Sequence, residues 1–326
     1  MDKKFVSIII PCRNEERFLA KCLDSIISQD YPKENLEVFV VDGASEDKTR
    51  EIANNYAVKN NFIRVLFNPR KTTPVSMNIG IKESKGEIII KMDCHAEYQN
   101  DYISKCVANL QKYGADNVGG ILKTLPSSNT PIAKSIALSL SSFFGAGNSY
   151  FRTGVKEAQE ADTVSFGCYK REVFDKIGLY NENLARSQDM ELNLRLKKAG
   201  GKIMLCPDII ATYYPKDNLK DFFLHNFQDG IWSIYPIKFT KFPFRARHYI
   251  PLAFVATVIF SFFFNWSAFV FISIIYFFAD IHFSQKSSKE GGDSELLLPL
   301  IAVFPARHFG YGLGSIWGLI KIILKV

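Results

Sequence analysis

The chain has 326 residues, with 40 Lys and Arg against 33 Asp and Glu, a formal net charge of +7 and a hydrophobic fraction of 47%. This composition excludes a collagen-like chain, a disordered tail protein and a polytopic transporter, and it is sufficient for one large domain or two small ones. The average hides an uneven distribution, because nine of the 28 phenylalanines lie in residues 249–279, where no residue is charged. The sequence therefore combines a polar part with an apolar C-terminal part.

The N-terminal half alternates between short apolar runs and amphipathic segments. Strands are expected at residues 6–10, 37–41, 62–67 and 87–92. Helices are expected between them, at residues 17–28, 48–59 and 74–84. This alternation predicts an α/β fold with a mainly parallel sheet and right-handed crossovers.

The pattern is less regular further along the chain. Helices are expected at residues 101–113, 171–177 and 189–199, and strands at 118–124, 163–169, 202–207 and 210–214. Residues 126–162 contain the run Gly145-Ala146-Gly147-Asn148 and are expected to include a mobile loop.

Six cysteines are scattered through these elements, with no CxxC pair and no zinc-finger spacing, which favours reduced thiols in a reducing compartment. The first residues lead straight into the first strand without an apolar signal-peptide region, so we expect this part of the chain to stay in the cytoplasm.

The apolar stretch 249–279 is too long for a surface segment. A single helix would be roughly 46 Å long, against about 30 Å of hydrocarbon core, and Asn265-Trp266-Ser267 interrupts it near the middle. Either one tilted helix or a hairpin of two short helices would fit. Basic residues on both sides favour a hairpin with both ends in the cytoplasm: Lys238, Lys241, Arg245 and Arg247 before it, and Lys286 and Lys289 after it. The alternative is a buried hairpin of a soluble protein.

Two further C-terminal segments mix apolar and polar residues. Residues 219–244 interleave aromatic residues with lysines, which predicts helices in the headgroup plane or, alternatively, a helix packed on the domain. Residues 296–326 are interrupted by Pro305, Arg307 and several glycines, and form either a third span or an interfacial pair.

Polar side chains follow the predicted strands, at the edge where parallel sheets bind ligands. They include Arg13-Asn14-Glu15, Asp42, Arg70-Lys71 and Asp93-Cys94-His95. There is no GxGxxG after the first strand and no GxxxxGK[ST], so neither a dinucleotide-binding fold nor a P-loop is supported.

Three of these motifs, in this order, resemble the family 2 glycosyltransferases, which adopt the GT-A fold: Pro11 to Glu15, Val41 to Ser45, and Asp93 to His95. The resemblance covers residues 5–215. It is closest to the subgroup typified by the succinoglycan glucosyltransferase ExoA, through Asp93 to Ala96, Val118 to Gly120, Phe144 to Asn148, Gln188 to Leu192 and the apolar tail. It implies a GT-A catalytic domain at 1–215, interfacial amphipathic helices at 216–248 and a membrane-associated helical region at 249–326.

The resemblance implies a donor site for a nucleotide sugar. Asp42 would accept hydrogen bonds from the base and the ribose, and Pro11, Arg13 and Glu15 would lie on the loop around them. For an isolated Asp42-Gly43 the alternative is a plain turn.

Asp93 and His95 stand where the family usually has Asp-x-Asp. Carboxylate and imidazole both coordinate Mn²⁺ or Mg²⁺, and such a cation would offset the charge of the donor diphosphate. Asp93 is the stronger expected ligand. The alternative for His95 is direct contact with phosphate or acceptor.

Asp189 corresponds to the family's general base, which takes the proton of the acceptor hydroxyl. Gln188 precedes it where the family commonly has Glu, and Glu191 is a weaker candidate. A role limited to the helix N-terminus is the alternative for Asp189.

Gln228 and Trp232 have the spacing of the QxxRW motif of processive family members, but Ile231 replaces its Arg. They are expected on the acceptor side, or Trp232 is an ordinary interfacial aromatic residue.

These features lead to the hypothesis of an inverting glycosyltransferase that moves one sugar from a nucleotide donor, most simply a UDP-sugar, to a polyprenyl-diphosphate-linked glycan. It would act at the cytoplasmic face of the cell membrane. The alternatives are a processive polysaccharide synthase, a nucleotidyltransferase and a membrane-anchored binder of sugar nucleotides. No nucleic-acid-binding motif is present.

Overall fold

The computed structural model describes residues 3–240 and 246–324. The chain forms two compact units, one of Met1–Lys123 with Gly154–Tyr213 and one of Thr124–Thr153 with Tyr214–Val326. We call them the N-terminal and the C-terminal unit. The functional boundaries expected at residues 215 and 248 stay a prediction, and Lys241 and Arg245 lie outside the described residues.

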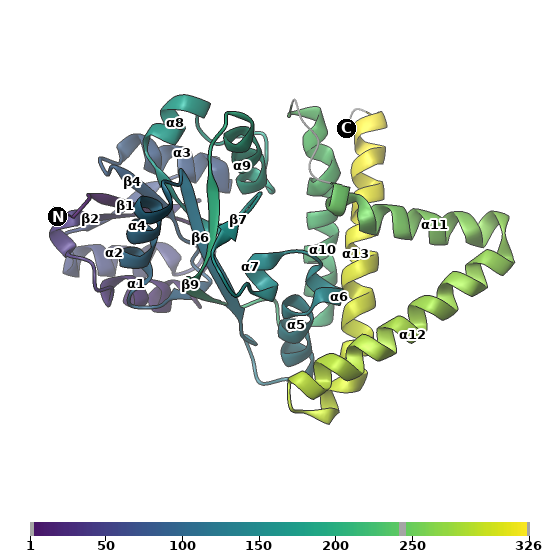
Figure 1. The fold of residues 1–326 in the computed structure, drawn as a ribbon. Helices are drawn as coiled ribbons and strands as arrows, with labels where there is room; N and C mark the ends of the chain where they lie inside the picture. The colour runs from purple at the N-terminus through teal and green to yellow at the C-terminus, as the bar shows by residue number, and fades with distance from the viewer. Residues whose placement is uncertain (1–2, 241–245, 325–326) are drawn as a thin grey trace. The chain divides into compact units, whose positions relative to one another are not determined.

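One mixed sheet forms the core of the N-terminal unit, with strand order β3-β2-β1-β4-β8-β6-β9-β5 and β7 paired to β9 (Figure 1). The strands are β1 (Val6–Cys12), β2 (Leu36–Asp42), β3 (Ile63–Phe67), β4 (Ile88–Lys91), β5 (Ala96–Tyr98), β6 (Asn117–Thr124), β7 (Gln159–Glu160), β8 (Ser165–Lys170) and β9 (Ile203–Tyr213). The first four are parallel, as the alternation predicts, and β8 joins β4 antiparallel.

Helices cover this sheet: α1 (Leu19–Ile27), α2 (Thr49–Lys59), α3 (Thr73–Glu83), α4 (Tyr102–Tyr113), α8 (Glu172–Ile177) and α9 (Gln188–Lys198), with a 3-10 turn η1 (Lys33–Asn35). Helix α1 buries Leu19, Cys22, Leu23 and Ile26, the face that its spacing predicts.

Strand order reverses at β1, which lies between β2 and β4. The loops after these strands therefore diverge and leave a crevice at the carboxyl ends of the strands.

One expectation about local structure is wrong. The strands expected at 202–207 and 210–214 are one strand, β9. Pro207 lies between the residues that pair with β7 and those that pair with β5, so its missing N–H interrupts neither ladder.

Residues 126–162 contain three helices that the sequence analysis did not predict: α5 (Pro131–Ser141), α6 (Phe143–Ala146) and α7 (Tyr150–Thr153). Thr130 caps α5 and Ser142 caps α6. The mobile loop expected within 126–162 stays a prediction.

The C-terminal unit is built on two helices in close contact, α10 (Leu219–Ile234) and α13 (Leu297–Leu324). Glycines permit the close approach: a Cβ on Gly230 would lie 2.0 Å from the Tyr311 carbonyl oxygen, and one on Gly314 would lie 2.0 Å from that of Phe227. Helix α13 continues through Pro305, so of the two alternatives left open for this segment the structure has the single long helix and not the pair; packing against α10, α11 and α12 supports it as one helix. Short 3-10 turns complete the unit: η2 (Tyr235–Lys238), η3 (Ala246–Tyr249) and η4 (Ser294–Leu296).

The predicted hairpin is confirmed as two helices, α11 (Ile250–Phe264) and α12 (Trp266–Glu290), which meet at Asn265 (Figure 1). Its large apolar side chains are exposed, including Phe260, Phe262, Phe263, Phe264, Trp266, Phe271, Ile274, Ile275, Phe277 and Phe278. Three described helical segments are long and apolar enough to cross a membrane: Ala246–Phe264, Trp266–Glu290 and Ser294–Leu324. Such exposure argues against the buried hairpin of a soluble protein.

Candidate active site

A cavity of about 210 Å³ lies at the carboxyl ends of the parallel strands of the N-terminal unit. Six residues selected from the sequence line it: Pro11, Arg13, Glu15, Asp93, His95 and Gln188. Lys71, which also follows a predicted strand, lines it as well, and so do Ser76 and Lys91, which the sequence analysis did not name. Asp42 and Asp189 are adjacent in sequence to the lining residues Gly43 and Gln188. The cavity thus gathers motifs from positions 11 to 188.

The loops after β1 and β2 are joined by hydrogen bonds that fix one wall of the cavity. Cys12 lies opposite Asp42 in the sheet register. The Asn14 amide donates to Ser45 Oγ at 3.0 Å, and the Glu15 amide donates to Thr49 Oγ1 at 2.7 Å. These bonds explain why the two motifs act as one structural element.

Left-handed backbone conformations are concentrated around this cavity. Asn14 and Ala44 have φ of 55°, Lys71 has 63°, and Ser187 has 60°. These are non-glycine residues in loops that follow β1, β2 and β3 or precede α9. Such conformations cost on the order of 1–3 kcal/mol each and concentrate at functional sites.

Asp42 has a buried carboxylate with one unsatisfied oxygen. The residue is 1% exposed, and its Oδ1 accepts from the Ser45 amide at 3.1 Å. Its Oδ2 has no hydrogen-bond partner among the described residues. A plain turn would account for Oδ1 but not for the orphaned acceptor, which is costly unless a ligand satisfies it.

The backbone of Asp93 is held in place while its carboxylate faces the cavity. The Asp93 amide donates to Tyr98 Oη at 2.7 Å, and Tyr98 lies in the core against Tyr102. His95 lies beside it with Nδ1 3.5 Å from Glu15 Oε1 and its ring edge-on to Tyr213.

The donor set fits a divalent cation only in part. No group of three or more His, Cys, Asp or Glu side chains suited to a metal occurs within residues 3–240 and 246–324. Burial raises the pKa of Cys22 and of Cys94, and their thiols donate to the carbonyl oxygens of Asp93 at 3.5 Å and of Pro11 at 3.6 Å. Asp93 and His95 would therefore hold a cation only together with ligands from outside the protein.

Asp189 opens α9 and is paired with a lysine. Its Oδ2 accepts from Lys91 Nζ at 2.5 Å, and its Oδ1 has no partner among the described residues. No side-chain cap bond is made at the N-cap Ser187. Glu191 differs, because it forms a buried ion pair with Arg195 at 2.7 Å and so serves the structure.

Lys91 links the two carboxylates and was missed in the sequence analysis. Its side chain is 5% exposed, and Nζ lies 3.7 Å from Asp93 Oδ1 as well as 2.5 Å from Asp189 Oδ2. Burial opposes its charge, but Asp189 and Asp93 outweigh burial and raise the pKa of Lys91, so it is charged at neutral pH. The signal was present: a lysine ends the apolar run Ile88-Ile89-Ile90, directly before Met92-Asp93.

We expect Lys91→Met to lower the activity of this site by roughly 10- to 100-fold, because it removes the cation between two carboxylates. Methionine retains most of the buried stem, so folding is expected to survive. Steady-state reaction rates and circular dichroism check this. Lys123→Met, on an exposed position of β6, is the matched control; equal rates for both variants would contradict the role of Lys91.

Gln228 and Trp232 lie on α10 of the C-terminal unit, one helical turn apart. Gln228 is exposed, and the Trp232 ring packs edge-on to Tyr235 at 5.6 Å. Their expected acceptor-side role stays a prediction.

The mixed sheet, with its crevice at the carboxyl ends of the parallel strands, has the GT-A fold. A sequence model of glycosyl transferase family 2 matches residues 7–178, more than half of the chain. The chain belongs to this family, and it is a glycosyltransferase.

Relatives and solved structures agree. The chain is 33% identical over 227 residues to the dolichyl N-acetyl-alpha-D-glucosaminyl phosphate 3-beta-D-2,3-diacetamido-2,3-dideoxy-beta-D-glucuronosyltransferase of Methanococcus voltae, covering 67% of this chain and 69% of that protein. It is 30% identical over 225 residues to the succinoglycan biosynthesis protein ExoA of Rhizobium meliloti, covering 68% and 67%. The fold matches the mannosyltransferase PcManGT of Pyrobaculum calidifontis, solved with GDP-Man and Mn²⁺, at a TM-score of 0.63 and 18% identity over 94% of this chain and 87% of that one.

Proposed function

We propose that this chain transfers one sugar residue, with inversion, from a nucleotide sugar to a lipid-linked glycan. The donor is a UDP-sugar, and the acceptor is a polyprenyl-diphosphate-linked glycan at the cytoplasmic face of the cell membrane, in the synthesis of a cell-surface polysaccharide or glycan. One observation carries the proposal: an orphaned Asp42 oxygen, the cavity carboxylate Asp93 and the Lys91–Asp189 pair are gathered at the carboxyl ends of neighbouring strands.

Each step of the reaction has a residue suited to it. Asp42 Oδ2 accepts from the base or the ribose, while Arg13 and Lys71, which line the same cavity, offset diphosphate charge. A divalent cation held by Asp93 and His95 would supply further charge neutralisation and favour departure of the nucleoside diphosphate. As the acceptor oxygen bonds to the anomeric carbon and the phosphate oxygen leaves, Asp189 takes the acceptor proton.

Two properties of the sequence and the relatives support this acceptor and a single transfer. The name of the Methanococcus voltae relative describes a sugar transferred onto a dolichyl-phosphate-linked sugar, which supports a polyprenyl-linked acceptor. Ile231 occupies the arginine position of the processive motif, which favours the addition of one residue over polymer synthesis.

A thermal-shift panel of nucleotide sugars, each with and without Mn²⁺, tests the donor half of the proposal on the full chain in detergent. We expect one nucleotide sugar to raise the melting temperature and the shift to require the cation. No shift with any nucleotide sugar would contradict the proposal.

The hairpin α11–α12 is proposed to enter the membrane and return to the same side. Helix α11 has 15 residues and is about 22 Å long, shorter than the ~30 Å hydrocarbon core. Lys238 and Arg247 precede the hairpin, and Lys286 and Lys289 follow it, which supports a cytoplasmic location for both ends.

Replacing three exposed aromatic residues at the tip, Phe263, Phe264 and Trp266, by serine is expected to weaken membrane binding by roughly 4.5–9 kcal/mol, at about 1.5–3 kcal/mol each. Flotation with liposomes measures the effect. Phe67→Ser, at an exposed Phe of the N-terminal unit, is the matched control. If the triple variant floats like wild type, the hairpin does not anchor the chain.

A further inference from the structure

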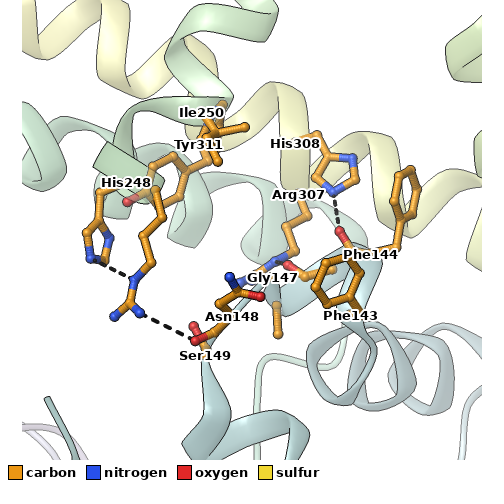
Figure 2. A pocket seen from close by; sticks show the side chains of 14 residues that line it. Phe143, Phe144, Gly147, Asn148, Ser149, His248, Ile250, Arg307, His308 and Tyr311 are labelled. Atoms are coloured by element: carbon orange, nitrogen blue, oxygen red, sulfur yellow. Dashed lines mark hydrogen bonds between the residues drawn. The ribbon is translucent and has the colours of Figure 1, made fainter. Parts of the chain in front are cut away.

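A second cavity, of about 280 Å³, lies entirely within the C-terminal unit. Its walls are α6 with the following residues 147–149, residues 247–251 around the start of α11, and residues 307–311 of α13 (Figure 2). The first of these walls contains Phe144-Gly145-Ala146-Gly147-Asn148, a motif for which the donor site provides no role. We call this space the basic cavity.

Two guanidinium groups lie on the polar surface of the basic cavity. Arg247 and Arg307 line it together with His248, whose Nε2 accepts from Arg247 Nε at 3.4 Å, and none of its described lining residues is acidic. Arg307 is held by two bonds, from Nε to the Gly145 carbonyl oxygen and from Nη1 to Asn226 Oδ1 at 3.0 Å. A guanidinium held in this way is preorganised for a planar, multi-oxygen anion such as a phosphate.

The wall that carries Arg307 is fixed by packing as well as by hydrogen bonds. His308, the next residue of α13, has Nε2 2.9 Å from the Phe144 carbonyl oxygen (Figure 2). Its Nδ1 lies 2.9 Å from Tyr276 Oη. A Cβ on Gly145 would lie 2.0 Å from the Ser139 carbonyl oxygen, so only glycine fits there. The cavity is therefore built into the fold.

The basic cavity also has an apolar side next to the hairpin. Phe143 and Ile250, which line it, are 65% and 64% exposed. Ile250 is the first residue of α11, so the cavity lies where the exposed apolar hairpin begins. Basic side chains next to the start of an apolar membrane segment are expected at the depth of the lipid headgroups, where phosphate groups lie.

We propose that the basic cavity binds the phosphate or diphosphate group of a lipid-linked acceptor, with Arg247 and Arg307 on the anion and the lipid chain along Phe143 and Ile250. This inference rests on the proposed function for the identity of the lipid. A phospholipid headgroup shares the phosphate chemistry. The acceptor is the better occupant because the site is a preformed cavity with two guanidinium groups, whereas a basic surface suffices for general headgroup attraction.

Binding is tested on the full chain in detergent with farnesyl diphosphate, and separately with farnesol, inorganic diphosphate and phosphatidylglycerol micelles. We expect farnesyl diphosphate to bind, farnesol to bind at least tenfold more weakly, and Arg247→Gln to weaken farnesyl diphosphate binding by roughly 10- to 100-fold. Arg307→Gln should weaken it similarly, but it also removes the bonds to Gly145 and Asn226. Lys286→Gln, on an exposed lysine of α12, is the matched control and should bind like wild type.

Three results would overturn the proposal: wild-type affinity in Arg247→Gln, equal binding of farnesol, or displacement of farnesyl diphosphate by phosphatidylglycerol at similar concentration. Displacement by inorganic diphosphate supports an anion site. The donor thermal shift is recorded on the same variants. If wild type binds farnesyl diphosphate but no nucleotide sugar raises its melting temperature, the proposed function alone is refuted. If Arg247→Gln responds to the donor and binds farnesyl diphosphate as wild type does, only the lipid site in the basic cavity is refuted.

Discussion

Asp189→Asn is expected to lower sugar transfer by roughly 100- to 10,000-fold, the usual contribution of a general base, while the donor-induced thermal shift is retained. Asparagine keeps the size of the side chain and can still accept from Lys91, but it cannot take the acceptor proton. Initial rates with saturating donor and acceptor measure the loss.

Glu191→Gln separates this role from a role in helix stability. Glu191 lies on the same helix and pairs with Arg195, so its replacement should lower the melting temperature and leave the transfer rate per folded molecule nearly unchanged. If Asp189 served only to interact with the macrodipole at the N-terminus of α9, its replacement would lower the free energy of unfolding by about 0.3–1 kcal/mol and leave the transfer rate unchanged. Transfer by Asp189→Asn at more than a tenth of the wild-type rate would exclude it as the base.

Asp93→Asn is expected to abolish the cation-dependent part of the donor thermal shift and to lower transfer at least 100-fold. The amide is a weaker ligand for a hard cation and carries no charge, and Asp93 is the best-placed carboxylate of the cavity. Titration of Mn²⁺ at fixed donor, followed by the melting temperature, measures the change.

Asp175→Asn, at an exposed position of α8, is the matched control and should behave as wild type. His95→Gln distinguishes the two roles open to His95: a raised Mn²⁺ requirement indicates a ligand, and an unchanged requirement with weaker acceptor binding indicates the alternative contact. A normal Mn²⁺ response in Asp93→Asn would remove Asp93 from the cation site.

Much of the fold could be predicted because apolar runs and helical spacing repeat along the N-terminal half. The ends of β1, β2 and β4 placed Pro11 to Glu15, Asp42 and Asp93 at one edge of the sheet, and the structure gathers them there. The prediction divided β9 at Pro207, because a proline in the sequence usually marks the end of a strand. In the structure Pro207 lies between the two ladders of β9 with β7 and β5, so neither ladder loses a hydrogen bond.

The remainder depends on contacts between distant parts of the chain. Lys91 lies 98 positions from Asp189 in the sequence, so its ion pair has no local pattern. In the basic cavity, Arg307 of α13 donates a hydrogen bond to the Gly145 carbonyl oxygen of α6. Neither composition nor spacing in the sequence indicates that these two residues meet. The three helices within 126–162 were missed because their Ser- and Gly-rich segments resemble a loop until their caps are seen.

The most direct test of the account is the product of a single reaction. The full chain in liposomes is incubated with the nucleotide sugar that the thermal-shift panel selects and a polyprenyl-diphosphate-linked acceptor, and the lipid product is analysed by mass spectrometry and NMR. We expect one added sugar per acceptor, one nucleoside diphosphate released per transfer, and an anomeric configuration opposite to that of the donor. A ladder of polymers, release of inorganic diphosphate, or retention of the donor configuration would contradict it.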